Sequence, residues 1–281
     1  MAHDRRTPAP KPEPKAPPRG SSRLGLREDP SLIWRGILAA ACLGAIFGLW
    51  SWGASGDDGN YLVPPPTDVL GSFTNLLDER DLVSNIFISL KRVVLGFGLA
   101  VLIAVPLGIV AASFRVVNAF LAPLQTFFRN TPMATLVPLT MVLFSLSEKQ
   151  KIAFIFMATF AFVLSDTVAA VMTIPQRYVE TAETVGASRR QIVIKVLTPL
   201  ALPDITTSIR FLFGLGFGYI ILAEMLDLSS GGLGAMIIVS QRRSNYDEMY
   251  MIVFVIVALA FVIDKVLHFF QRGVFPYRKD L

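Results

Sequence analysis

Long apolar runs separated by short polar stretches fill the chain from about residue 36 onward. A helix needs about 20 apolar residues to cross a bilayer, so these runs leave room for five or six crossings. The expected crossings are 36–52, 93–113, a broken segment over 119–146, 152–172, 205–225 and 249–270. Pro132 breaks the helix in the third, and the run after it is too short to span alone, so the third crossing either is discontinuous or starts a turn earlier. The pattern therefore predicts an all-α polytopic membrane protein.

Small residues recur at steps of four within two of these runs, which lets helices pack closely in lipid. They are Gly96, Ala100, Ala104, Gly108 and Ala112 in one run, and Gly214 and Gly218 in another. Apolar residues between Val69 and Leu77 also follow helical spacing after three prolines. We expect an amphipathic helix there, lying on the outer membrane surface. The apolar piece from Leu233 to Val239 is too short to cross and predicts a re-entrant helix.

One polar, basic stretch, residues 175–203, interrupts the apolar runs and predicts a hairpin of two short helices. Tyr178, Ala182 and Val185 give the first helix an apolar face. Gly186 ends that helix, because glycine takes the left-handed conformation without steric cost.

The second helix of this hairpin begins at Ser188, which forms a capping box with Gln191. Val196 belongs to its apolar side. Pro199 and Pro203 bracket the exit and are expected to prevent a continuous helix into the next crossing.

Composition agrees with a membrane protein, because 53% of the 281 residues are hydrophobic and only 17% are charged. The net charge of +5 resides mainly in the tails and the 175–203 loop. Membrane topology explains it through the positive-inside rule, so nucleic acid is not expected as a partner. Both termini and the loop are then cytoplasmic. Residues 1–31 predict a disordered, basic, proline-rich tail, with the permease domain over 32–281; a signal peptide is the competing interpretation, against which no cleavage site is evident.

Several charges lie where the topology does not favour them, and each is expected either to snorkel to the interface or to pair with a nearby charge. The expected pairs are Lys91 or Arg92 with Glu79 or Asp81, Arg242 or Arg243 with Asp247 or Glu248, and Asp264 with Lys265. Arg210 is expected near a helix end, where its side chain can snorkel to the interface.

The chain offers no chemistry of its own for catalysis or for binding ATP. It has no phosphate-binding loop with the G-x-x-x-x-G-K-[ST] pattern. Its two histidines, His3 and His268, and its one cysteine, Cys42, lie far apart in sequence. We therefore expect no catalytic residue, no metal site and no cofactor.

Ionisable residues inside membrane helices are costly and often functional. Asp166 either lines a translocation path or makes a buried hydrogen bond to a neighbouring helix. Glu224 either lines the same path or ties its helix to the external loop. Arg129, Asn130 and Thr131 precede a helix break and either face an anion or form a cytoplasmic turn capped by Thr131.

The hairpin sequence resembles a motif of membrane subunits of bacterial ATP-binding-cassette importers. The motif reads E-A-A, three residues, G, nine residues, I-x-L-P, and its matches are Glu180, Ala182, Gly186, Val196 and Pro199. Thr181 and Thr198 depart from it. Features elsewhere, including P-P-P-T-D-V, A-E-M and G-L-G, are similar to the nitrate, sulfonate, taurine and bicarbonate branch of this family. The resemblance implies the type I importer permease fold, with the hairpin as a cytoplasmic coupling helix.

The same resemblance implies partners and a function. The partners are an ATPase subunit, a periplasmic or lipid-anchored substrate-binding protein, a second permease protomer in a homodimer, and the bilayer of the bacterial inner membrane. The function is inward movement of a small solute, an anion such as nitrate, sulfonate, taurine or bicarbonate, by alternating access. The residues expected to dock the ATPase are Tyr178, Glu180, Ala182, Val185, Gly186, Ala187, Ser188, Arg189, Val196 and Pro199. A secondary transporter and a membrane scaffold without transport are the alternatives.

Overall fold

The computed structural model describes residues 31–54 and 62–276 and divides the chain into two units. The first unit, up to Gly53, contains most of α1 (Leu32–Ala54), where the first crossing was expected. The second unit starts at Ala54 and carries all the remaining helices. The predicted disorder of residues 1–31 lies, except for Ser31, outside the described residues. So does the end of the C-terminal tail.

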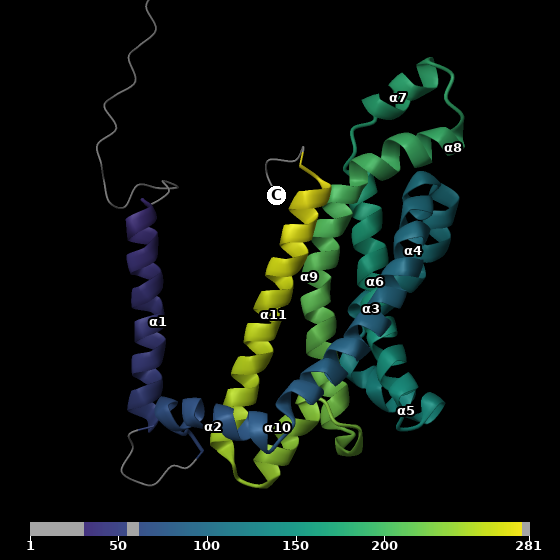
Figure 1. Ribbon diagram of the computed structural model, residues 1–281. Helices are drawn as coiled ribbons and strands as arrows, with labels where there is room; N and C mark the ends of the chain where they lie inside the picture. The colour runs from purple at the N-terminus through teal and green to yellow at the C-terminus, as the bar shows by residue number, and fades with distance from the viewer. Residues whose placement is uncertain (1–30, 55–61, 277–281) are drawn as a thin grey trace, which may run out of the picture. The chain divides into compact units, whose positions relative to one another are not determined.

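Helices joined by short loops make up the described part of the second unit (Figure 1). Its α-helices are α2 (Pro66–Asp78), α3 (Leu82–Ser113), α4 (Arg115–Asn130), α5 (Leu136–Phe144), α6 (Glu148–Met172), α7 (Arg177–Thr184), α8 (Arg189–Ile192), α9 (Thr198–Met225), α10 (Leu233–Arg242) and α11 (Tyr246–Val274). Short segments of other helix types are η1 (Met133–Thr135), η2 (Val193–Leu197) and η3 (Leu228–Ser230).

Five helical stretches in the described residues are long and apolar enough to cross a membrane. They are Ile33–Ala54, Leu82–Ser113, Glu148–Met172, Arg189–Met225 and Tyr246–Val274. The remaining expected crossing is divided between α4 and α5, with the break at Thr131 and Pro132. The prediction of a discontinuous third segment is therefore confirmed.

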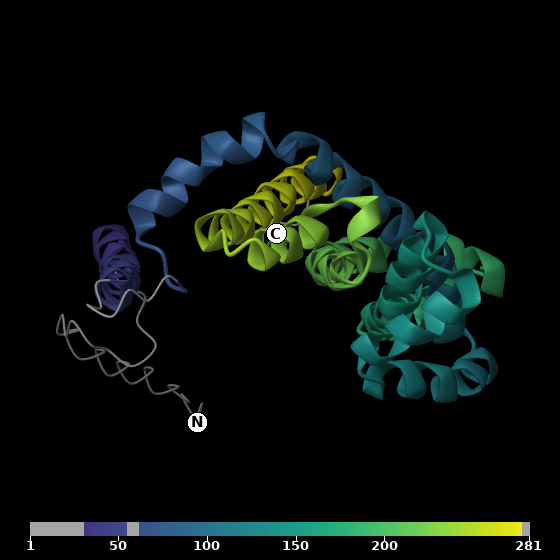
Figure 2. The same ribbon diagram turned by 90° about the horizontal axis from the view of Figure 1, so that it is seen from below.

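The core of the second unit forms where α3, α6 and α9 meet, and small residues of α3 allow the close approach. A Cβ added to Gly96 would lie 2.8 Å from the carbonyl oxygen of Ile152, and one added to Gly108 would lie 2.7 Å from Cβ of Thr167. Ala100 and Ala104 are completely buried between them. Figure 2 shows α9 lying between α11 and the group formed by α4, α5 and α6. The packing role predicted for the α3 stripe is confirmed.

The predicted packing of Gly214 and Gly218 is wrong for the described chain. A Cβ added to either glycine would meet no atom within 4 Å. Gly216 makes the close contact instead, because its added Cβ would lie 3.3 Å from Cγ2 of Thr159 on α6. The sequence spacing identified the right helix but the wrong face.

The two ends of the second unit differ in construction (Figure 1). The hairpin of α7 and α8 forms one end, which we call the hairpin end. Helices α2 and α10 lie at the other, which we call the opposite end. Helix α2 buries Val69, Ser72 and Leu76, which confirms that it is amphipathic.

Pro199 and Pro203 do not end the helix, contrary to the prediction. Helix α8 continues through η2 into α9, so residues Arg189–Met225 form one helical stretch. The segment η2 is a π-helix, in which the Thr198 N–H donates to the Val193 carbonyl five residues earlier. This wider turn accommodates a residue that lacks an N–H, which is how membrane helices commonly tolerate proline.

Candidate functional site

The turn between α7 and α8 depends on Gly186, as predicted. Its φ is +80°, in the left-handed region that favours glycine. The N–H of Gly186 donates to the Glu183 carbonyl at 2.9 Å, and the N–H of Ala187 donates to the Ala182 carbonyl at 3.0 Å. These two bonds satisfy the last carbonyls of α7 and reverse the chain sharply.

The capping box at the start of α8 is also confirmed. The Ser188 hydroxyl accepts from the Gln191 N–H at 3.4 Å, and the Gln191 side-chain oxygen accepts from the Ser188 N–H at 2.8 Å. Because α8, η2 and α9 are continuous, this cap fixes the start of a helix that runs into the core. A displacement of the hairpin would therefore act directly on α9.

Most residues expected to dock an ATPase are exposed on this hairpin. The exposed ones are Tyr178, Glu180, Val185, Gly186, Ser188, Arg189 and Pro199. Ala187 and Val196 are half-buried, and Ala182 is buried with Ile192 between the two helices. Val185, at the tip of the hairpin, leaves 79% of its surface exposed.

Some of the residues expected to line a translocation path lie where α4, α6 and α9 meet. The carboxylate of Asp166 interacts with Ser208 of α9 and with the charge of Arg129 on α4. The neighbouring Ser165 donates to Gln125 Oε1 at 3.3 Å. Asn130 is exposed, and the Thr131 hydroxyl donates back to the Phe127 carbonyl at 2.7 Å. Asp166 on α6 thus contacts the neighbouring helix α9, as one of the two interpretations of this residue predicted.

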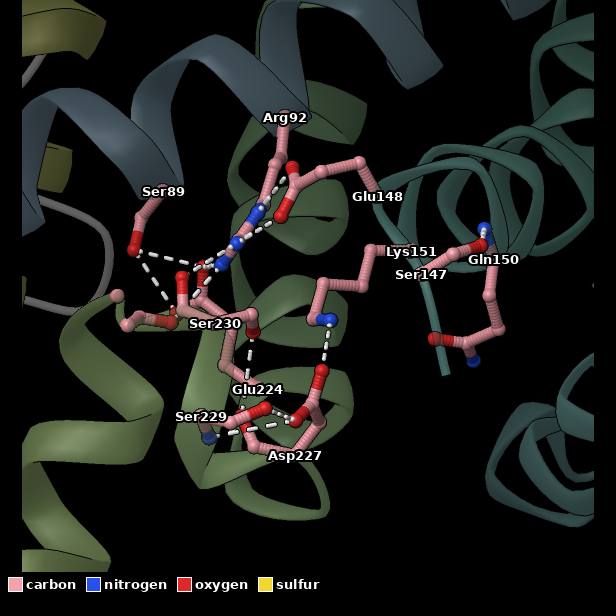
Figure 3. A network of polar contacts seen from close by, with 12 residues as sticks. Ser89, Arg92, Ser147, Glu148, Gln150, Lys151, Glu224, Asp227, Ser229 and Ser230 are labelled. Carbon is pink, nitrogen blue, oxygen red and sulfur yellow. Dashed lines mark hydrogen bonds and ion pairs between the residues drawn. The ribbon is translucent and has the colours of Figure 1, made fainter. Parts of the chain in front are cut away.

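Glu224 lies elsewhere, in a buried ion-pair network at the opposite end of the unit (Figure 3). Its carboxylate is completely buried and accepts from Arg92 Nη1 at 2.7 Å. The Ser89 hydroxyl lies 2.9 and 2.8 Å from its two oxygens, and the Gly234 N–H donates at 3.0 Å. Glu224 therefore ties α9 to α3 and α10, which was one of its two predicted roles.

Arg92 links this carboxylate to two further elements. Its Nε donates to Glu148 of α6 at 2.9 Å, and its Nη2 also contacts Glu148. The same guanidinium donates to the backbone carbonyls of Ser230 at 2.8 Å and Gly231 at 3.0 Å. Arg92 is 1% exposed, so the expected pairing with Glu79 or Asp81 is wrong. A buried guanidinium requires several partners at once, and they are supplied where α3, α6, α9 and the segment of Ser230 and Gly231 meet.

The loop before α10 is shaped to fit around Glu224. A Cβ added to Gly232 would lie 2.3 Å from the Glu224 carboxylate, and one added to Gly234 would lie 2.3 Å from the Ile221 carbonyl oxygen. The Gly232 N–H also donates to Asn85 Oδ1 at 2.7 Å. The glycines are therefore needed because the loop backbone touches the buried acid directly.

A second buried pair continues the network. Lys151 of α6 is completely buried and donates to Asp227 Oδ2 at 2.6 Å. Asp227 Oδ1 accepts from the Ser229 hydroxyl at 2.7 Å. The bond from Lys151 lowers the pKa of the Asp227 carboxyl to about 2. Asp227 thus remains charged at any physiological pH and holds the end of α9 against α6.

Glu248, at the start of α11, is the centre of a separate buried cluster. It accepts from Asn75 of α2 at 3.1 Å, from Arg80 at 3.3 Å and from Ser240 of α10 at 3.0 Å. The expected pairing of Arg242 or Arg243 with this acid is wrong, because Glu248 is enclosed by these other partners. Both arginines are exposed.

The expected pairing of Asp264 with Lys265 is wrong as well. Asp264 of α11 pairs with Arg210 of α9, with Nε and Oδ1 3.0 Å apart. Arg210 Nη1 also contacts His268 Nδ1 at 2.5 Å and Gln271 Oε1 at 3.2 Å. Adjacent residues on a helix point in different directions, whereas these groups face each other between two helices.

Comparison with known proteins bears on most of the chain. Residues 104–278 match the family described as binding-protein-dependent transport system inner membrane component. A putative ABC transporter permease protein of Methanocaldococcus jannaschii is 35% identical over 207 residues, covering 74% of this chain and 78% of that protein. The taurine transport system permease protein of Escherichia coli is 30% identical and covers 78% and 81%.

A solved structure gives the same result for the fold. The chain resembles a chain in a structure of inward-facing conformations of the MetNI methionine ABC transporter, with a TM-score of 0.59. The match covers 69% of this chain and 95% of that chain at 22% identity. The type I permease fold expected from the sequence is therefore confirmed.

Proposed function

The chain belongs to the family of inner-membrane components of binding-protein-dependent transport systems, and from this premise we propose that its α7–α8 hairpin couples a separate ATPase to solute import. The chain is a multi-pass permease subunit of an ABC importer. Its partners are accordingly an ATPase subunit and a substrate-binding protein. The single observation that carries the proposal is the capped hairpin itself, continuous with a membrane-crossing helix.

The exposed groups of the hairpin support docking. Val185 and Tyr178 present apolar surface at a polar end of the protein, while Arg189 and Glu180 offer charges beside them. Apolar anchors surrounded by polar groups are typical of protein interfaces. ATP-driven closure of the ATPase would displace the hairpin, and the helix from Arg189 to Met225 would carry that displacement into the bilayer.

The hairpin end is cytoplasmic in this proposal, as are both termini. The opposite end then faces the binding protein. A second copy of the chain completes the transporter as a homodimer, with the solute path between the protomers. Arg129, Asn130, Thr131 and Asp166 remain candidates for that path. The contact of Asp166 with Ser208 and with the charge of Arg129 supports a shared polar surface.

The solute we propose is a small molecule with an oxyanion group, because the E. coli relative is named for taurine, which carries a sulfonate. Secondary transport and a non-transporting scaffold are the rival functions. Uptake of radiolabelled taurine into proteoliposomes, with the permease, its ATPase and its binding protein, separates the three. Import requires ATP inside the vesicle, secondary transport does not, and a scaffold gives no uptake.

Two substitutions at one position test the coupling hairpin. Gly186→Val should abolish uptake, because a β-branched residue is strained at a φ of +80° and the turn must open. Gly186→Asn should retain most uptake, because asparagine visits the left-handed region readily. Co-purification of the ATPase from mild detergent gives the second readout.

The matched control is Gly71→Val on α2, at the opposite end, where an added Cβ meets no atom within 4 Å and φ is not positive. This variant should import normally. Normal uptake by Gly186→Val with a normally bound ATPase would overturn the coupling role of the hairpin.

A further inference from the structure

The last turns of α11 have an inward and an outward face of different character. The inward face packs on α9, to which the buried Gln271 side chain donates two hydrogen bonds. The outward face carries two phenylalanines and two cations at steps of four, four and three, which we call the basic-aromatic face: Phe261, Lys265, Phe269 and Arg272. All four are exposed, and the two phenylalanines leave 61% and 77% of their surface uncovered.

The basic-aromatic face lies where the hydrocarbon of a bilayer ends, on the side of the hairpin end (Figure 1). Residues 249–263 of α11 carry no charge, and Glu248 before them bonds to α2 at the opposite end. A bilayer core takes about 20 helical residues, which, counted from Glu248, ends near His268. Lys265 is therefore about one turn inside that level and Arg272 about one turn beyond it. Long basic side chains at both positions can reach the headgroups.

The charge at this level is positive. Asp264 is the last acid in the described part of α11, and its carboxylate is paired with Arg210 of α9 at 3.0 Å. It therefore neutralises Arg210 and not the cations of the basic-aromatic face. The Lys265 ammonium lies 5.1 Å from the centre of the Phe261 ring, a contact with an aromatic face and not with a carboxylate. Lys265 and Arg272 together give the face two positive charges at headgroup level.

We propose that the basic-aromatic face binds an anionic phospholipid. The phosphate lies between Lys265 and Arg272, which are about 10 Å apart along the helix axis, within reach of both side chains. Arginine holds phosphate oxygens through its planar fork, and basic residues beside a membrane helix recognise anionic lipids. The exposed rings of Phe261 and Phe269 contact the acyl chains. This inference goes beyond solute import and does not depend on it.

Other occupants fit this face less well. A second copy of the chain would meet it through a two-fold interface, in which a patch contacts itself. Lys265 and Arg272 would then each face a like charge, which opposes association. A zwitterionic phospholipid offers the same acyl chains but no net negative charge for the two cations. A soluble phosphate lacks the chains that would cover Phe261 and Phe269.

Native mass spectrometry of the full chain tests the proposal, with equal amounts of phosphatidylglycerol and phosphatidylcholine in a mild detergent. The wild type should retain phosphatidylglycerol in preference to phosphatidylcholine. Lys265→Gln with Arg272→Gln should lower the bound phosphatidylglycerol by about tenfold or more, because both cations near the headgroup are lost. Lys265→Arg with Arg272→Lys keeps both charges and should bind like the wild type. A wild type without preference between the two lipids would overturn the proposal.

Two exposed arginines at the opposite end provide the matched control. Arg242→Gln with Arg243→Gln removes the same charge from α10 and its end, away from the basic-aromatic face. This variant should keep the wild-type preference for phosphatidylglycerol. Size-exclusion profiles and thermal unfolding establish that both double variants are folded. Equal loss of the lipid in the two double variants would show that net charge alone attracts it, and the proposed site would fall.

The aromatic half of the face has its own test in the same assay. Phe269→Ala should lower the bound phosphatidylglycerol by about threefold, because apolar contact with the acyl chains is lost. Phe87→Ala, which removes a phenylalanine of α3 that is 64% exposed, should leave it unchanged. Added glycerol 3-phosphate, the soluble headgroup, should not displace the lipid. Displacement at equal concentration would show a phosphate site without a lipid and overturn the proposal.

Cross-linking separates a lipid from a second copy of the chain. Phe269→Cys, with Cys42→Ser to remove the natural thiol, carries one cysteine on the basic-aromatic face. A short bismaleimide should give no cross-linked dimer in membranes if lipid covers this face. A cross-linked dimer would show that a second copy covers it and would overturn the proposal. Uptake is measured in none of these experiments, so a failure of the import function leaves the lipid site standing.

Discussion

The two ends of the protein are stabilised in opposite ways. At the opposite end, Arg92, Glu224 and Lys151 are buried, and their contacts join segments more than 50 residues apart in the sequence. At the hairpin end, the defining contacts of Gly186 and Ser188 are to residues within five positions. One end is held by long-range ion pairs and the other by local caps.

This difference has a consequence for motion. Segments held by buried charge pairs separate only at a large cost, because each group would be left unpaired in an apolar surrounding. A hairpin held by its own caps can move as a unit, because nothing in its turn depends on the rest of the molecule. In the proposed function, the rigid end keeps α3, α6, α9 and α10 together while the hairpin end receives the displacement.

The largest expected effect comes from removing the centre of the network. Arg92→Met should destabilise the protein by about 3–5 kcal/mol, because it leaves the buried Glu224 carboxylate without its cation. Thermal unfolding of the detergent-purified protein measures this. Lys91→Met, at the adjacent exposed position, should have little effect.

A double variant tests whether pairing is the cause. Arg92→Met with Glu224→Gln should be less destabilised than Arg92→Met alone, because the one carboxylate left without Arg92, Glu148, has a side chain that is 57% exposed to solvent. If Arg92→Met melts like Lys91→Met, long-range ion pairs do not hold this end and the contrast with the hairpin disappears.

The second pair should matter less, because Asp227 is not fully enclosed. Lys151→Met should cost about 1.5–3 kcal/mol, the usual range for a hydrogen bond to a charged group. Lys149→Met, two residues earlier and exposed, serves as the control in the same unfolding assay. Equal melting temperatures for the two variants would show that the bond to Asp227 contributes nothing.

The same pair predicts a dependence on pH. The pKa of Asp227 is about 2 in the folded protein, against about 3.9 in an unfolded chain. Because the folded pKa is the lower one, its contribution is complete above about pH 4 and is lost as pH falls towards 2. The stability difference between wild type and Asp227→Asn should therefore be constant from neutral pH to about 4 and shrink below it. A difference that stays constant down to about pH 2 would contradict the assigned pKa.

Sequence reasoning succeeded where the controlling contacts are local. The left-handed Gly186 and the capping box of Ser188 with Gln191 follow from residues within one turn, and both were confirmed. The packing role of the small-residue stripe of α3 was confirmed. Its spacing of four residues follows from helix geometry within one segment. These are features that a short window of sequence determines.

Sequence reasoning failed where the interacting residues are far apart in the sequence. Arg92 contacts residues 56 and 132 positions away, and no local pattern identifies them. Its position against the topology rule was the available signal that it needed unusual partners. Lys151 and Glu248 gave less warning, because each lies close to other charged residues near a helix start. For Pro199 and Pro203, the rule that proline ends a helix failed. A π-helical turn, η2, lets the helix continue from α8 into α9.

The smallest expected effect concerns the cap of α8 and completes the contrast between the two ends. Ser188→Ala removes the acceptor for the Gln191 N–H and should cost about 1 kcal/mol of local helix stability. The melting temperature should barely change, because the network at the opposite end sets it. Hydrogen exchange should instead quicken at the amides of Arg190 and Gln191, with amides of α3 unaffected. Ser188→Thr, which keeps the hydroxyl, should exchange like the wild type. If Ser188→Ala lowered the melting temperature as much as Lys151→Met, the hairpin would be part of the global fold, and it could not move as an independent coupling element.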